Sequence, residues 1–409
     1  MTSDLVDVAI VGGGPAGLAA AAQLRRQGVE RVVVLEREAI GGGVPRHCGH
    51  PPFGMREFGR LLAGPAYTRR LVSMATESGA ELRLEANVVE ISPCGDRQLI
   101  RYTTPEGLGM IKARRVLLAT GTRESPRSAR LLSGDRPLGV INTGALQAYA
   151  YLEKLAPFSR PVIVGTELVA LSAILTCRSL GAKPVAMIEE NARPTAPYSF
   201  FLFPRLLGIP VLTGTNLTDI AGMPRVTHVT VEHNGEKRDI DCDGVILSGK
   251  FISENHLARL AGLVIDRATG GPEIDQFGRS SNAAIYAAGN LLRPVETAGW
   301  SFREGRSIGS FIARDLFSSL PQPSSTPAIT LGHGLRYAMP QRFVLDPGGL
   351  TVLQLRVDRP LKGELVATDS AGKRLYGQRI NTLPERRVTM PLAFSGRTAA
   401  PITISIHER

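Results

Sequence analysis

The opening residues alternate between strand-like and helix-like hydrophobic patterns. Residues 5–11 (LVDVAIV) form a short apolar run, and a glycine-rich turn follows. Residues 16–28 (AGLAAAAQLRRQG) have the Ala/Leu-rich pattern of a helix that stops at Gly28, and RVVVLE (31–36) is apolar again. Strand, helix and strand within about 30 residues predict a βαβ unit whose two strands run parallel.

A second βαβ unit is predicted near the middle of the chain. PVIVG (161–165) and KPVAMIE (183–189) are its strands, and residues 167–180 form its helix. Before it, we expect a helix over 66–79 and strands over 81–92, 98–103 and 114–121. After it, apolar and polar residues alternate to about 247, and a strand (284–290) and a helix (303–318) follow.

The last part of the chain has a different pattern. PQPSSTP (321–327) has the composition of a linker, and residues 328–409 alternate as short strands with the turn signals DPGG and DSAGK. We predict a small antiparallel β module here. The fold class is therefore α/β, with two Rossmann-like dinucleotide-binding domains and a C-terminal β module.

Composition excludes several protein classes. The 409 residues are 43% hydrophobic, which is too apolar for a disordered chain. No apolar run reaches the roughly 18 residues that a membrane span needs, and MTSDLVD has no basic region typical of a signal peptide. We expect a cytoplasmic protein with no membrane span.

Cysteine spacing and charge narrow the chemistry further. The four cysteines (48, 94, 177 and 242) are scattered without a Cys-x-x-Cys pair, which argues against a structural metal site, an iron–sulfur cluster or a disulfide framework. The net charge is +11, but the 41 arginines are dispersed and form no run with interleaved aromatics. We attribute the charge to arginine-rich composition and anionic cofactors, and expect no nucleic-acid partner.

The first glycine turn has the spacing of a nucleotide-binding loop. In Gly12-Gly13-Gly14-Pro15-Ala16-Gly17, the first glycine permits the turn, Gly14 lets the backbone approach a pyrophosphate and Gly17 lets helix and strand pack closely. The helix N-terminus then faces the anion. Glu36, 24 residues after Gly12, ends the second strand, where it can accept hydrogen bonds from an adenosine ribose.

Two later strands end in small residues, in an order that resembles a known family. These are Leu117–Gly121 (LLATG) and Ile285–Asn290 (IYAAGN). With the first turn and the second βαβ unit, they resemble the pyridine nucleotide-disulfide oxidoreductase-like flavoproteins over residues 5–318. The resemblance implies FAD bound by two chain segments, with a nicotinamide-type domain inserted between them. Asn290 stands where the family usually has the Asp that holds the ribityl chain.

The resemblance gives domain boundaries and a set of FAD-binding residues. The FAD domain is expected at 1–125 and 251–320, the inserted NAD(P)-type domain at 126–250, the linker at 321–327 and the β module at 328–409. The expected FAD-binding residues are Gly12, Gly14, Pro15, Ala16, Gly17, Glu36, Arg37, Gly42, Gly43, Val88, Ala119, Thr120, Gly121, Gly289, Asn290 and Thr297.

The redox segment of the family is altered here. Its disulfide branch carries G-G-T-C-x-x-x-x-C, and laid on Gly42–His50 the two cysteine positions fall on Pro45 and His50. A dithiol relay needs two adjacent sulfurs, so we expect none. His47, Cys48 and His50 are candidate catalytic groups beside the flavin; the alternative is that the histidines only bond locally and Cys48 is a small buried side chain. Residues 296–300 (ETAGW) are further candidates.

The glycine turn of the second βαβ unit departs from the nucleotide-binding pattern. Gly165 and Glu189 match Gly12 and Glu36 in spacing, but Glu167 stands where the pyrophosphate should approach. A bulky anion there is hostile to a dinucleotide. We expect the domain to keep its fold without binding NAD(P)H well; if NAD(H) binds, Glu189 disfavours a 2′-phosphate.

A narrower resemblance concerns function and partners. GGVPRHCGHPPFG and GPAYTRRL are similar to flavoprotein subunits of hetero-oligomeric dehydrogenases of the opine oxidase and hydrogen cyanide synthase type. The first hypothesis is an FAD-dependent oxidoreductase acting on a small-molecule substrate. The alternative is a non-catalytic or electron-transfer subunit, partnered with a second flavoprotein dehydrogenase subunit. We expect an oligomer, and the basic β module, with 12 basic against 6 acidic residues over 325–409, either docks an acidic partner or packs on its own FAD domain.

Overall fold

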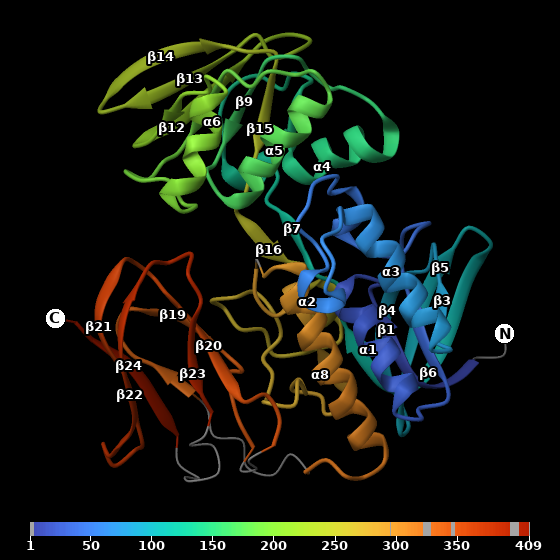
Figure 1. Ribbon diagram of the computed structural model, residues 1–409. Coiled ribbons are helices and arrows are strands. Elements are labelled where there is room, and N and C mark those ends of the chain that lie inside the picture. Colours follow the sequence, from blue (N-terminus) through green and yellow to red (C-terminus); the bar gives the residue numbers. More distant parts are fainter. Residues whose placement is uncertain (1–3, 295, 322–328, 345–347, 393–400, 409) are drawn as a thin grey trace.

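The structure, a computed structural model, describes residues 4–294, 296–321, 329–344, 348–392 and 401–408. The chain forms two α/β domains and a C-terminal β module (Figure 1). Apart from Pro321, the predicted linker at 321–327 lies outside the described residues. Within the described part of the chain, no helix has the length and apolar character needed to cross a membrane.

The first domain is built on a seven-stranded sheet. Its path is β3-β2-β1-β6-β5-β4, and β17 pairs with β6. The strands are β1 (Asp4–Val11), β2 (Val32–Leu35), β3 (Glu81–Arg83), β4 (Asn87–Cys94), β5 (Arg97–Thr104), β6 (Gly107–Leu118) and β17 (Ile285–Ala287). β1 pairs in parallel with both β2 and β6, and β6 pairs in parallel with β17. Segments far apart in sequence thus share one sheet. The parallel pairing of β1 with β2 confirms the first predicted βαβ unit.

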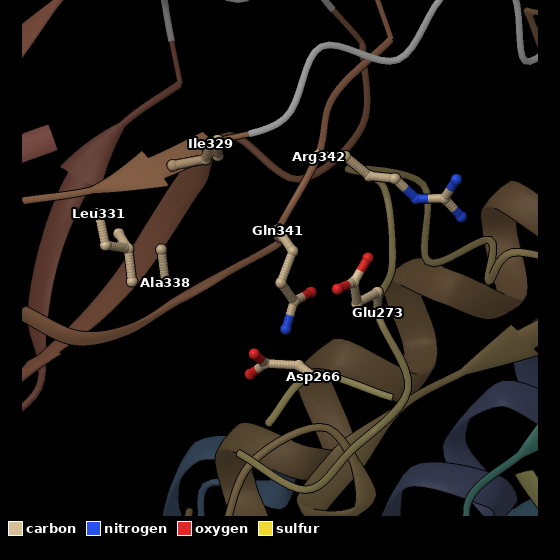
Figure 2. Close-up of a pocket in the computed structure, with 7 residues that line it drawn as sticks. All are labelled: Asp266, Glu273, Ile329, Leu331, Ala338, Gln341 and Arg342. Carbon is tan, nitrogen blue, oxygen red and sulfur yellow. The ribbon is translucent and has the colours of Figure 1, made fainter. Parts of the chain in front are cut away.

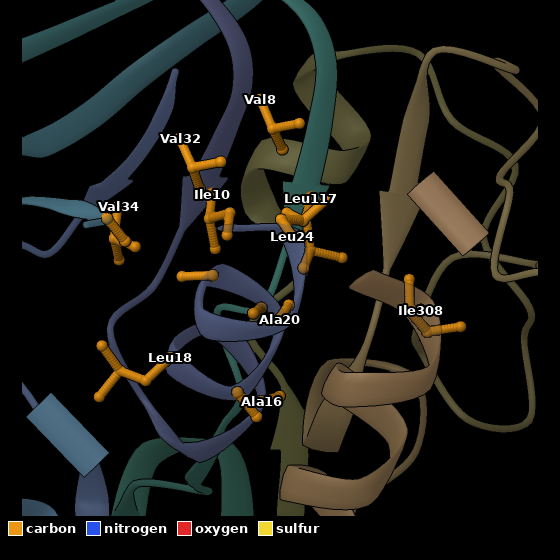
Figure 3. Close-up of a cluster of buried hydrophobic side chains, with 14 of the residues drawn as sticks. Val8, Ile10, Ala16, Leu18, Ala20, Leu24, Val32, Val34, Leu117 and Ile308 are labelled. Atoms are coloured by element: carbon orange, nitrogen blue, oxygen red, sulfur yellow. The ribbon is translucent and has the colours of Figure 1, made fainter. Parts of the chain in front are cut away.

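Three helices cover one face of this sheet: α1 (Pro15–Arg26), α3 (Gly64–Glu77) and α8 (Ala298–Leu316). Val8, Ile10, Leu18, Leu24 and Ile308 belong to the core between them (Figure 3). α1 and α8 pack closely, because a Cβ on Gly305 of α8 would lie only 2.0 Å from the carbonyl oxygen of Ala16.

Helix α8 begins five residues earlier than the predicted residue 303. Its first turn contains Gly299, where a Cβ would lie 2.9 Å from Oε1 of Glu57. Glu57 belongs to α2 (Met55–Phe58), which packs on this end of the helix. The helix thus extends N-terminally beyond the predicted range, into a turn that packs on α2.

The second domain has a parallel sheet of its own. The order is β11 (Val211–Leu212), β10 (Ala186–Ile188), β9 (Pro161–Val164), β15 (Gly244–Leu247) and β8 (Val140–Asn142). The predicted second βαβ unit is β9, α5 (Leu168–Ser179) and β10. The other elements are α4 (Thr143–Ala148), η3 (Tyr149–Glu153), η4 (Tyr198–Phe201), α6 (Leu202–Leu206), and a three-stranded sheet of β12 (Thr215–Ala221), β13 (His228–His233) and β14 (Glu236–Asp241).

Two short strands join these domains. The chain leaves the first domain through β7 (Thr122–Glu124) and returns through β16 (Phe251–Ser253), and the two strands pair antiparallel. Nearby are the short helices η1 (Val44–His47), η2 (Arg127–Arg130), α7 (His256–Leu260) and η5 (Gly289–Leu291). Arg130 on η2 donates to the backbone oxygens of Ser125, Ser248 and Gly249, so one guanidinium holds both crossing segments.

Over its described residues, the C-terminal module has two small sheets. One contains β18 (Ile329–Leu331), β24 (Ile402–Glu408), β21 (Leu361–Thr368) and β22 (Arg374–Thr382), and the other contains β19 (Leu335–Met339), β20 (Val352–Val357) and β23 (Val388–Pro391). The antiparallel prediction is wrong for one pair, because β18 and β24 run parallel. These strands come from opposite ends of the module, so no hairpin constrains their direction.

The module packs on the first domain. Met339 is fully buried in the core on the far face of the first sheet, and Val344 packs with Phe277 and Leu320. The Gln276 side chain also donates to the Val344 carbonyl (2.7 Å) and accepts from its N–H (2.7 Å). The module is therefore joined to its own chain by apolar burial and by buried hydrogen bonds.

Candidate functional site

The first glycine turn connects β1 to α1, and no side chain of the described residues fills the space beside Gly14. Gly12 has φ +108°, and a Cβ on Gly17 would lie 2.0 Å from the Gly12 carbonyl oxygen, so both positions need glycine. For Gly14 the nearest atom to a built Cβ is the Gly43 Cα, at 3.9 Å. Pro15 and Ala16 open the helix behind the turn. The space over Gly14 is what a pyrophosphate would need.

Glu36 is placed beside this turn by the end of β2. It is 7% exposed; its Oε2 accepts the Gly13 N–H (2.8 Å) and its Oε1 accepts the Glu38 N–H (3.0 Å). Carboxylate oxygens have further lone pairs, so these bonds hold the side chain in place and still allow ribose hydroxyls to donate to it. Arg37 is exposed and pairs with Glu38 at 3.6 Å.

A second segment crosses the same turn. The Gly42 N–H donates to the Gly13 carbonyl (2.7 Å), and a Cβ on Gly43 would lie 3.0 Å from the Gly14 Cα. Gly42 has φ +120° and faces Thr68 of α3, with no room for a side chain. This segment therefore packs against the turn at Gly13 and Gly14, which brings two of the predicted FAD-binding regions together.

The two later motifs end at neighbouring strands of the sheet. The Ala119 N–H donates to the Val11 carbonyl (2.8 Å), and the Ala288 N–H to the Leu118 carbonyl (3.0 Å). Thr120 and Gly121 follow the strand, and the Thr120 hydroxyl donates to the carbonyl of Glu254, just after the returning strand β16 (2.7 Å). The strand ends of both motifs thus meet beside the glycine turn.

Gly289 and Asn290 lie on η5, at this edge of the sheet and before α8. Gly289 has φ +77°, a Cβ there would lie 2.9 Å from the Ala16 Cβ, and its N–H donates to Oε2 of Glu304 (2.8 Å). The Asn290 side chain accepts the Glu296 N–H (2.9 Å) and donates to the Glu296 carbonyl (3.1 Å). The amide thereby fixes the turn into α8 and keeps one N–H for a ligand hydroxyl.

The remaining predicted FAD residues lie at the margins. Val88 is buried on β4, and Thr297 is an exposed residue immediately before α8. Sequence reasoning missed Glu304, which also pairs with the buried Arg293 (3.1 Å). Taken together, the bare glycine turn, the ribose-type carboxylate and the open strand ends fit a bound FAD.

The altered redox segment forms η1 and the loop after it. Cys48 is 8% exposed, and its Sγ lies 3.4 Å from Oε1 of Gln147 on α4 and 3.5 Å from the Val44 carbonyl oxygen. Burial, with a smaller contribution from Glu124, raises the pKa of the Cys48 thiol to about 12. The thiol is therefore a weak nucleophile at neutral pH.

The two histidines of this segment differ in surroundings. Burial and the charge of Arg46 lower the pKa of His47 to about 4, and its Nδ1 is buried with no hydrogen-bond partner among the described residues. His47 is therefore neutral at pH 7 and can accept a hydrogen bond. The Nδ1 of His50 lies 3.0 Å from the Pro51 carbonyl oxygen, and its ring packs near Phe53.

Sequence reasoning missed Glu124, which ends β7. Its Oε2 accepts the Gly144 N–H (2.8 Å) in the first turn of α4, and burial raises the pKa of its carboxyl to about 7. The local sequence TRE gives no signal of this, because the burial comes from the neighbouring domain. Glu124 and Cys48 both contact α4, so the redox segment and the crossing strand meet there.

In the second glycine turn, the side chain of Glu167 fills the space that is open in the first turn. The Glu167 carboxylate lies against Gly165 and Gly249, whose built Cβ atoms would be 2.5 Å and 2.0 Å from its oxygens. Glu189 is 4% exposed and accepts hydrogen bonds from the hydroxyls of Thr166 and Thr195 and from both nitrogens of Asn191. The residues of this turn do not fit a dinucleotide in the way those of the first turn do.

The segment after Asn290 is held by the C-terminal module. Glu296 is buried and accepts from Nη2 of Arg356 (3.2 Å) and from Nε of Arg387 (3.2 Å). The Arg387 guanidinium also lies 4.0 Å from the Trp300 ring centroid, a cation–π geometry. Burial, followed by the charges of Arg293 and Arg56, lowers the pKa of Arg387 to about 10. The module thus covers part of the predicted flavin-proximal segment.

A separate cavity of about 350 Å³ lies between the module and the first domain. In Figure 2 the side chains of Asp266, Glu273 and Gln341 gather around it, whereas the end of Arg342 points away. None of its lining residues belongs to the predicted FAD site. No group of His, Cys, Asp or Glu within the described ranges could hold a metal ion.

Comparison with known proteins agrees with this arrangement. Residues 6–305 match the family described as "Pyridine nucleotide-disulphide oxidoreductase". The chain is 27% identical over 349 residues to the alpha subunit of sarcosine oxidase from Rhizobium meliloti, covering 82% of this chain and 33% of that protein, so it spans about a third of that relative. It is 26% identical to the A subunit of opine oxidase from the same organism, covering 78% of this chain and 72% of that one.

A solved structure shows the same fold. The thioredoxin reductase of T. acidophilum has a TM-score of 0.66 and 21% identity, and the match covers 77% of this chain and all of that one. The family match ends inside α8, at residue 305, so the C-terminal module lies beyond it.

Proposed function

We propose that this chain, which belongs to the pyridine nucleotide-disulphide oxidoreductase family, passes electrons between its bound FAD and either a small organic substrate or a partner subunit, without a redox disulfide. The chain is an FAD-dependent oxidoreductase. When bound, FAD supplies the redox chemistry at its ring. The observation that carries the proposal is the bare turn at Gly14 beside the buried Glu36.

In this site the chain's own residues bind and orient. The turn from Gly12 to Gly17 offers backbone N–H groups at a helix N-terminus to a diphosphate, and Glu36 accepts from ribose hydroxyls. Asn290 offers its free amide N–H to a hydroxyl of the cofactor chain. Neutral His47 can accept a hydrogen bond at Nδ1 from a polar group that enters beside η1.

The absence of a redox disulfide is supported by residue type and environment. Pro45 and His50 occupy the positions that the family's cysteines would take, and all four cysteines are free. The hydrogen-bond neighbours of Cys48 Sγ are an amide oxygen and a carbonyl oxygen, not a second sulfur. Cys48→Ser should therefore retain FAD, and a thioredoxin-type or glutathione-type reductase activity that disappears with this substitution would refute the proposal.

The binding test uses the one glycine of this turn whose side-chain space is open. Gly14→Ala adds a methyl group that meets no atom of the chain closer than 3.9 Å, so the fold should survive. The methyl group would occupy the pyrophosphate position, so FAD affinity should fall at least tenfold in absorbance titration. Full FAD binding by Gly14→Ala, or a native chain that takes up no FAD, would count against the site.

A second candidate function is a subunit that passes electrons without a substrate of its own. It is favoured by the relatives, since the alpha subunit of sarcosine oxidase and the A subunit of opine oxidase are, by name, parts of larger enzymes. A turnover assay of the isolated chain with artificial electron acceptors and a panel of amines and hydroxy acids separates the two functions. Turnover by the isolated chain supports the first, and turnover only after addition of a second dehydrogenase subunit supports the second.

A further inference from the structure

The second glycine turn contains a carboxylate where the first has empty space. Glu167 occupies the position equivalent to Gly14, two residues after the first glycine of each turn. Its two carboxylate oxygens lie against the backbone of Gly165 on one side and Gly249 on the other. Gly165 has φ +117° and Gly249 has φ +66°, and only a hydrogen at each Cα leaves room for the carboxylate.

The two turns share one backbone contact. In the first domain the Gly42 N–H donates to the Gly13 carbonyl (2.7 Å), and in the second the Ala196 N–H donates to the Thr166 carbonyl (3.0 Å). In both, a segment after the second strand of the βαβ unit crosses the turn. The crossing segment of the first domain thus has a counterpart in the second, and Glu167 is the side chain that fills the turn beneath it.

The neighbours of Glu167 hold it in this position. Gly249 belongs to the segment that returns to the first domain, and its carbonyl accepts from Nη2 of Arg130 (2.8 Å). The same guanidinium binds the Ser248 carbonyl (2.9 Å), so the wall against the Glu167 carboxylate is braced by a partly buried side chain. The ribose-type carboxylate of this domain, Glu189, is already bonded to Thr166, Thr195 and Asn191.

We propose that Glu167 fills the pyrophosphate position of the second domain, so that this chain excludes NAD(P)H and its flavin exchanges electrons with a different partner. A dinucleotide would have to displace a side chain that is packed between two backbone segments. The family to which the chain belongs is named for pyridine nucleotides, and the second turn does not fit one. The exclusion of NAD(P)H concerns the second domain alone, whereas the statement about the flavin's partner rests on the function proposed above.

The test is a binding measurement that needs no flavin chemistry. Isothermal titration calorimetry with ADP-ribose and with NADH should detect no binding to the native chain at millimolar ligand. Glu167→Gly restores the glycine of the motif and should bind ADP-ribose at least a hundredfold more tightly. Glu167→Gln keeps the volume of the side chain and should remain closed, and Glu236→Gln, at an exposed position on β14, is the matched control.

Each result of the calorimetry has a distinct meaning for the proposal. Micromolar binding of either ligand to the native chain would overturn the proposal without any variant. Binding to Glu167→Gln as tight as to Glu167→Gly would also overturn it, because volume would then not be the cause. If Glu167→Gly does not fold, Glu167→Ala serves in its place, and a folded variant that gains no affinity refutes closure by Glu167. FAD content measured on the same samples reports separately on the first domain.

Discussion

Replacing Glu124 with glutamine should stabilise this protein, and by an amount that grows with pH. The carboxyl sits at the end of β7, with its Oε2 accepting the Gly144 N–H at 2.8 Å. A glutamine carbonyl oxygen can accept the same hydrogen bond. The substitution therefore removes the ionisable proton and leaves the contact with α4 in place.

The magnitude follows from the pKa, which burial raises from 4.5 to about 7. A carboxyl whose folded pKa is raised favours the folded state while it is protonated. That stability is fully present below pH 4.5 and is lost as the pH rises through about 7. At roughly 1.4 kcal/mol for each pKa unit, ionised Glu124 costs up to about 3 kcal/mol at pH 8. This is an upper bound because the side chain is not fully buried.

The assay is urea unfolding of the native chain and Glu124→Gln at several pH values between 4 and 8. The free energy of unfolding should differ little at pH 4, and the variant should become the more stable one as the pH rises. Glu106→Gln, at an exposed position between β5 and β6, is the control and should show no such trend. A difference that stays constant with pH, or that favours the native chain at pH 8, would refute the linkage.

Three further predictions concern the first domain. In the cofactor-free state, Gly14→Ala should have the same thermal unfolding temperature as the native chain. In absorbance titration it should bind FAD at least tenfold more weakly. Cys48 should react with a thiol reagent at pH 8 far more slowly in the folded chain than in urea, since its pKa is raised to about 12; equal rates would contradict the burial argument. Glu296→Gln should destabilise the chain by about 3 kcal/mol because it leaves the charges of Arg356 and Arg387 without their partner, whereas Glu385→Gln, in a more exposed pair, should change little.

Local patterns were enough to predict both βαβ units. Each is a contiguous stretch in which the strand period, the glycine turn and the helical period follow one another, so no distant contact is needed to recognise it. The unusual residue Glu167 was also visible in the sequence, because it breaks the glycine spacing of the motif. What the sequence could not supply is where that carboxylate goes: Gly249, which forms one wall, is 82 residues further along the chain.

Other features depend on contacts between distant segments. Glu124 is flagged by no motif, and its raised pKa arises from burial against the second domain. The parallel pairing of β18 with β24 joins strands more than 70 residues apart, which hydrophobic alternation alone cannot specify. The same holds for Arg387, which reaches Glu296 across 91 residues of sequence.

The position of the C-terminal module changes what a truncation would mean. The basic module could have been a free docking surface, but Met339 is buried in the core of the first domain and Arg387 holds Glu296 six residues after Asn290. Removing the module would uncover that core and leave Glu296 without its Arg356 and Arg387 partners. Because these contacts lie on the segment that leads from the FAD-type motif into α8, a loss of FAD after truncation would not by itself identify a partner-binding role. Substitutions on the outer strand β22, whose residues are largely exposed and which the module could present to another protein, leave this packing intact and are the sharper way to examine docking.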